Sequence, residues 1–131
     1  VFSFFGEVDE FINSADGDAD MAPFIEGLTT LKAQLQEATT WLMQNGMTDF
    51  NNAGASSHDY LHLFGLTGLA FMWAKMAKIA LEKKAAGDPF YEEKLTTGYY
   101  FVDRMVPDGA AHLAKVKTGA KSMMALPAEA F

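Results

Sequence analysis

The fold of this chain is decided by residues 57–87, SHDYLHLFGLTGLAFMWAKMAKIALEKKAAG. Serine and aspartate open the stretch and favour a helix N-terminus, while Gly87 favours a helix end. At 100° per residue, most of the polar side chains fall on one narrow strip, made of Thr67, Lys75, Lys78 and Glu82. A helix with so narrow a polar strip must be covered by neighbours on several sides. We therefore expect residues 57–86 to form the central helix of a helical domain, capped by Ser56 or Ser57.

Three further helices are predicted from apolar residues at helical spacing, over residues 2–13, 22–45 and 89–124. The last range contains Pro107, but the apolar positions stay in phase on both sides of it. We therefore expect one long helix that is kinked near Val106. Short polar breaks separate the four helices, and Gly87-Asp88-Pro89 is the clearest of them. The predicted fold class is all-α, an antiparallel up-down four-helix bundle that forms a single domain over residues 1–131.

Composition limits the possible functions. The 131 residues suffice for one domain, and the net charge of −7 with a single arginine, Arg104, argues against a nucleic-acid partner. Cysteine is absent, so disulfides and thiolate chemistry are excluded, which suits a cytoplasmic location. The longest apolar run, residues 63–74, is too short to span a membrane, so no membrane partner is expected. The chain starts at Val1 inside a predicted helix, and we therefore expect it to be a fragment of a longer protein.

Two motifs resemble metal sites, and we interpret both as structural. His58 and His62 lie one helical turn apart, as zinc ligands do, but no third ligand is indicated nearby. Asp16, Asp18 and Asp20 match the start of a calcium-binding loop, yet the glycine and glutamate that such a loop requires further on are missing. We therefore assign no metal ligand, and expect a solvated turn at the three aspartates.

Other abundant or unusual side chains have a packing interpretation. Most of the methionines have core spacing, so we expect them to fill the core rather than to line a ligand cavity. They are Met43, Met47, Met72, Met76, Met105, Met123 and Met124. Residues 99–101, two tyrosines and a phenylalanine, are also interpreted as packing residues. Trp41 lies on the flank of its helix beside small residues, and both a docking surface and ordinary partial burial remain open for it.

No catalytic constellation is present. The chain has no glycine-rich phosphate loop, no nucleophile elbow and no arrangement of serine, histidine and aspartate at a supporting spacing. Glu92, Glu93 and Asp103 fall on the outward face of the last predicted helix, where solvated charge is the usual role. We assign no catalytic and no cofactor-binding residue to this chain.

The order of several packing motifs nevertheless resembles a known family. On the predicted helices these motifs are Glu37-Ala38-Thr39-x-Trp41-Leu42, Tyr60-Leu61-x-Leu63-Phe64-Gly65 and Trp73-Ala74-x-Met76-Ala77. They continue with Lys94, Tyr99-Tyr100, Arg104, Pro107, Gly119 and Leu126-Pro127-x-x-x-Phe131. From about residue 20 to residue 131, the sequence resembles the C-terminal helical extension of a bacterial acyl-CoA dehydrogenase subgroup, which includes enzymes similar to 3-methylmercaptopropionyl-CoA dehydrogenases.

This resemblance implies a parent enzyme that binds FAD and oxidises an acyl-CoA thioester between its α and β carbons. In that family the catalytic glutamate and the flavin site belong to the main body, upstream of the extension. The implied role of this chain is to pack on the catalytic body or on a neighbouring subunit of a homo-oligomer. The alternative is a free-standing helical bundle that binds a small apolar ligand or a partner helix.

Overall fold

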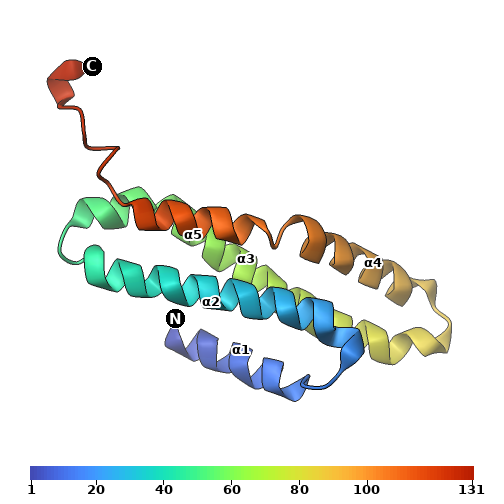
Figure 1. The fold of residues 1–131 in the computed structure, drawn as a ribbon. Coiled ribbons are helices and arrows are strands. Elements are labelled where there is room, and N and C mark those ends of the chain that lie inside the picture. Colours follow the sequence, from blue (N-terminus) through green and yellow to red (C-terminus); the bar gives the residue numbers. More distant parts are fainter.

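The computed structural model describes all of residues 1–131. Its helices are α1 (Phe2–Ser14), α2 (Ala22–Asn45), α3 (Phe50–Lys83), α4 (Pro89–Arg104) and α5 (Asp108–Thr118). Short 3-10 turns lie at Ala19–Met21, Lys84–Ala86 and Ala128–Ala130, and no strand is present. Figure 1 shows that α1, α2, α3 and the line of α4 and α5 run in alternating directions. The predicted all-α bundle is confirmed.

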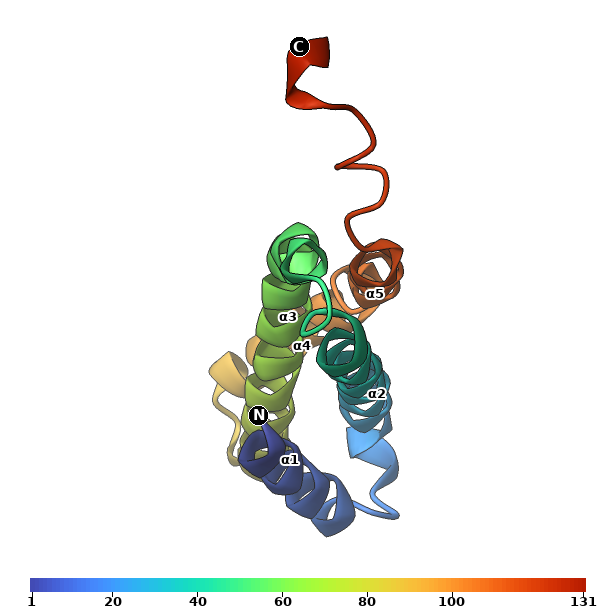
Figure 2. The same ribbon diagram turned by 90° about the vertical axis from the view of Figure 1, so that its left-hand side faces the viewer.

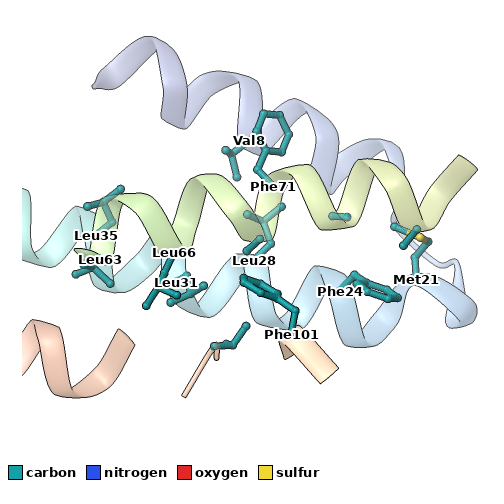
Figure 3. Close-up of a cluster of buried hydrophobic side chains, with 14 of the residues drawn as sticks. Val8, Met21, Phe24, Leu28, Leu31, Leu35, Leu63, Leu66, Phe71 and Phe101 are labelled. Carbon is teal, nitrogen blue, oxygen red and sulfur yellow. The ribbon is translucent and has the colours of Figure 1, made fainter. Parts of the chain in front are cut away.

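The core lies between α2 and α3. The apolar stripe of α2 is buried along its length, at Phe24, Leu28, Leu31, Leu35 and Ala38. Buried side chains from three other helices meet this stripe (Figure 3), and among them are Val8, Leu63, Phe71 and Phe101. One continuous cluster of 20 buried apolar residues results. Its burial is the main force that holds the helices together.

Helix α1 packs along only part of the surface formed by α2 and α3. Figure 2 shows α1 beneath these two helices, on the side away from α5. The ring of Phe4 stacks on Phe64 with centroids 5.3 Å apart, and Phe11 meets the edge of Phe71 at 5.7 Å. The order of these contacts shows that α1 runs parallel to α3.

The central helix begins seven residues before the predicted start at residue 57. Asp49 is the N-cap, and its carboxylate accepts a hydrogen bond from Asn51 N at 2.9 Å. Ser56 lies inside the helix, where its buried hydroxyl donates to the carbonyl of Val116 on α5 at 2.8 Å. The prediction of a loop and of a serine cap is therefore wrong. Contact with α5 makes helix favourable in a stretch rich in asparagine, glycine and serine, whose local preference is for turns.

The predicted single helix over residues 89–124 is also wrong, because the structure divides it into α4 and α5. Pro107 has no N–H to donate, and the N–H of Val106 bonds to the carbonyl of Phe101, five residues back. The two helices nevertheless lie on one line along the bundle (Figure 1), in keeping with the preserved apolar phase. Helix α5 ends at Thr118 because Gly119 adopts a positive φ of 62°.

Beyond α5 the chain forms a C-terminal arm, residues 119–131, that leaves the bundle (Figures 1 and 2). Its departure is fixed by Asn52 on α3, whose side-chain oxygen accepts a hydrogen bond from Ala120 N at 3.0 Å. The large apolar side chains of the arm, Met123, Met124, Leu126 and Phe131, are exposed. Helix α5 therefore ends at Thr118, about six residues before the end predicted from the sequence.

Helix α3 is long and apolar enough to cross a membrane by length and composition. The segment Phe50–Ala86 reaches a mean hydropathy of 1.2 over 18 residues, and 44% of that window is buried inside the bundle. The core helix of a helical bundle has the same properties, so this finding is weak evidence for a membrane span.

After α3, Gly87 has the left-handed φ of 88°, and the Asp88 side chain caps α4 as the sequence predicts.

Candidate functional site

One face of α3 is apolar and uncovered. Leu61, Leu69, Met72 and Ile79 are between 44% and 68% exposed. Their spacing places them in one row along the helix, together with Gly65 and the half-buried Met76. We call these six residues the α3 row, and none of them is charged. At about 1.5 Å per residue the row is about 27 Å long.

The neighbouring helices cover the two flanks of α3 and leave the α3 row open. On one flank, Phe4 of α1 packs against Phe64 and Phe71. On the other flank, Trp73 stacks on Phe101 of α4, and the Lys94 ammonium lies 5.1 Å from the Trp73 ring centroid. Contiguous apolar rows of this kind on a folded surface are typical of interaction sites.

The polar strip predicted for α3 is only partly exposed: Lys75 and Glu82 are exposed, Lys78 is half-buried beside α1, and Thr67 lies in the core. Thr67 is fully buried, and its hydroxyl donates to the carbonyl of Leu63 at 2.8 Å. The ammonium of Lys75 lies 4.1 Å from the ring centroid of Phe71, and Lys78 lies 5.8 Å from that of Phe11. Neighbours cover α3 on several sides, as the sequence predicts, but the surface that lacks a neighbour also includes the apolar α3 row.

The methionines do not fill the core. None of the seven predicted core methionines is buried, and Met76 alone among them is half-buried. Met21 is the buried methionine. Of the three aromatic residues predicted to pack, Phe101 is buried, whereas Tyr99 and Tyr100 are exposed. Helical spacing identified the faces on which these residues lie but not which face the bundle would leave open.

An open apolar groove lies at the end of the bundle where α2 turns into α3. We call it the end groove, and its volume is about 480 Å³. Its lining contains no charged side chain and consists of Thr39, Leu42, Met43, Gly46, Met47, Phe50, Ala53, Ser57 and Tyr60. The hydroxyls of Thr39 and Tyr60 are 2.8 Å apart and bond to each other. The sequence signalled this site only through its exposed methionines.

The structure brings together all three histidines of the chain. His62 stacks between His58 and His112, with centroid distances of 4.2 and 5.4 Å. His112 Nδ1 is 2.8 Å from an oxygen of Asp59, which ties α5 to α3. The chain contains no group of three or more histidine or acidic side chains placed to hold a metal ion. This cluster therefore has a structural explanation, the connection between two helices.

The aspartate-rich turn also has a structural explanation. The carboxylate of Asp18 accepts a hydrogen bond from Asp20 N at 3.1 Å and caps the short turn Ala19–Met21. Asp16, Asp18 and Asp20 are exposed.

Trp41 is half-buried and packs on the core. A Cβ added at Gly119 would lie 3.1 Å from its ring atom Cη2. The tryptophan thus covers the point where the C-terminal arm leaves the bundle, and the packing interpretation explains its position.

The surface offers no site suited to FAD. Five open pockets of about 300 to 480 Å³ are present; no arginine lines any of them, and the only lysines in their linings are Lys117 in one pocket and Lys94 in another. A dinucleotide needs backbone N–H groups or cationic side chains around its diphosphate. Glu92, Glu93 and Asp103 are exposed and form no cluster. The residues of this chain do not fit the cofactor.

Residues 4–127 match the protein family described as "Acetyl-CoA dehydrogenase C-terminal like". The chain belongs to this family. The match covers nearly the whole bundle and supports an accessory C-terminal domain of an acyl-CoA dehydrogenase. A search of curated proteins found no match to the chain.

Proposed function

We propose that this chain is the packing domain of an FAD-dependent acyl-CoA dehydrogenase similar to 3-methylmercaptopropionyl-CoA dehydrogenases. The parent reaction is the α,β-dehydrogenation of an acyl-CoA thioester, in the cytoplasm. The flavin and the catalytic base lie in the rest of the parent polypeptide, because the residues here fit neither role. The domain docks on that catalytic body, or on a neighbouring subunit of a homo-oligomer, and contributes stability rather than chemistry.

The observation that supports this proposal most strongly is the uncovered α3 row. Leu61, Leu69, Met72 and Ile79 stand on the longest helix of the bundle, opposite its core face. Burial of apolar surface stabilises an association at roughly 25 cal/mol per Å², so a row of this length favours a partner. A domain that belongs to the C-terminal part of a larger enzyme has such a partner in the same polypeptide.

The test is the visible absorption spectrum of the purified full-length polypeptide. We expect a flavin spectrum that is bleached when an acyl-CoA substrate is added anaerobically, since the substrate reduces the flavin. The 131-residue chain alone is expected to bind no flavin and to show no bleaching. A full-length polypeptide that is purified without flavin and does not take up added FAD would refute the proposal.

A further inference from the structure

We propose that the end groove is filled by the residues that directly precede Val1, which extend α1 backwards by about four helical turns. The inference rests on the family assignment, because a C-terminal domain has polypeptide before it. It goes beyond the proposed function in naming the connection between the catalytic body and this domain: a continuous helix rather than a flexible linker.

The first argument is position. Helix α1 lies on α2 and α3 but has only 13 residues, against 24 in α2 and 34 in α3. Figure 1 shows that both partners continue past the first residue of α1 towards their connecting turn. The end groove lies on this uncovered part, between the C-terminal half of α2 and the N-terminal end of α3.

The second argument is register. Phe4 contacts both Phe64 and Phe71, and Phe11 lies beside both Phe71 and Lys78, so each α1 residue lies level with an α3 residue about 63 positions later in the chain. If α1 continues backwards in the same register, a residue about one helical turn before Val1 comes level with Tyr60. Phe50, at the far end of the groove, then comes level with a residue about ten positions further upstream, or about 15 Å along a helix.

The third argument is continuity of the contact surface. Phe64, which packs on Phe4, also meets the edge of Tyr60 at a centroid distance of 6.1 Å. Tyr60 is already part of the groove lining, so the surface that holds α1 runs directly into the end groove. Because the groove has no charge and each of its three hydroxyls already has a hydrogen-bond partner, it suits the apolar face of a helix.

The native methionines provide the test. Met43 and Met47 in the groove are 51% and 73% exposed, and Met124 and Met123 in the C-terminal arm are matched at 61% and 67%. Oxidation by dilute peroxide is followed peptide by peptide in the full-length polypeptide, and each rate is compared with the same protein unfolded in guanidinium. Since oxidation follows exposure, we expect Met43 and Met47 to react at least about tenfold more slowly in the folded protein. Rates within about twofold of the unfolded value would overturn the proposal.

A pair of variants identifies the occupant. Phe2 is the first residue of α1 in the structure, a position where proline is well tolerated. In a longer helix the same position is interior, and proline breaks the helix there. We expect Phe2→Pro to restore rapid oxidation of Met43 and Met47, and Phe2→Ala, which removes the same ring, to keep them protected.

Protection that persists in Phe2→Pro would overturn the proposal and indicate another occupant. Loss of protection on dilution would then identify that occupant as a second copy of the chain. This test is independent of the test of the proposed function. A flavin-free polypeptide can still protect Met43 and Met47, and a flavoprotein can leave them exposed.

Discussion

Substituting alanine for Gly109 should destabilise the bundle, although the same change at most helical glycines is stabilising. Gly109 is buried in the first turn of α5, and an added Cβ would clash with the ends of the Leu31 and Gln34 side chains. Leu31 is fully buried and has no free space to move into. Overpacking of this kind costs about 1–3 kcal/mol, and the helix propensity of alanine returns at most about 1 kcal/mol. We therefore expect a net loss of about 1 kcal/mol in the free energy of unfolding.

The assay is thermal unfolding of the 131-residue chain, followed by circular dichroism. For a domain of this size, about 1 kcal/mol lowers Tm by about 4 °C. Gly65→Ala is the matched control, because an added Cβ there meets no atom within 4 Å. In the middle of α3 it should raise Tm by about 2–4 °C. If Gly109→Ala were as stable as Gly65→Ala, the close approach of α5 to α2 would be refuted.

Two further substitutions test polar contacts between helices. Ser56→Ala removes the buried hydrogen bond to the Val116 carbonyl and should lower the free energy of unfolding by about 1–2 kcal/mol in a urea titration. Ser57→Ala is the control: the Ser57 hydroxyl is exposed and bonds within its own helical turn, so its loss should change the free energy of unfolding by less than about 0.5 kcal/mol. Equal effects of the two serines would contradict the assigned contact. Tyr60→Phe removes the bond to Thr39 and should cost about 0.5–1.5 kcal/mol by the same titration, and an unchanged midpoint would show that this bond contributes nothing.

The sequence predicts the helices well where local signals and packing agree. The stripe of α2 is an example, because its regular leucines coincide with the buried face. So is the break at Gly87 and Asp88, where a left-handed glycine and a capping aspartate act locally. In both places, nearby residues determine the structure without help from distant ones.

The predicted helix bounds are wrong where contacts between residues far apart in the sequence determine the structure. The start of α3 was missed because the contact of Ser56 with α5 outweighs a loop-like composition. The end of α5 was missed because Gly119 adopts a positive φ there, and Asn52, 68 positions away, holds the N–H of Ala120 outside the helical pattern. Hydrophobic spacing shows which residues share a face, but it does not show whether another helix of the same chain covers that face.

The same limit applies to the candidate site. The α3 row and the end groove consist of apolar residues at ordinary helical spacing, and they differ from core positions only in lacking a neighbour. The resemblance of the sequence motifs correctly indicated a C-terminal acyl-CoA dehydrogenase-like domain, but helical spacing could not identify the apolar surfaces that the bundle leaves uncovered.

The measurement that tests this account most directly is covalent footprinting of the α3 row in two forms of the protein, the full-length polypeptide and the 131-residue chain. A photoactivated carbene reagent labels side chains according to their exposure, and the yield at Leu61, Leu69, Met72 and Ile79 is read by mass spectrometry. If this domain docks through α3, labelling of the row falls several-fold in the full-length polypeptide, while the exposed Glu92 and Glu93 on α4 serve as the reference. Equal labelling of the row in both forms would contradict the claim that α3 is the docking face.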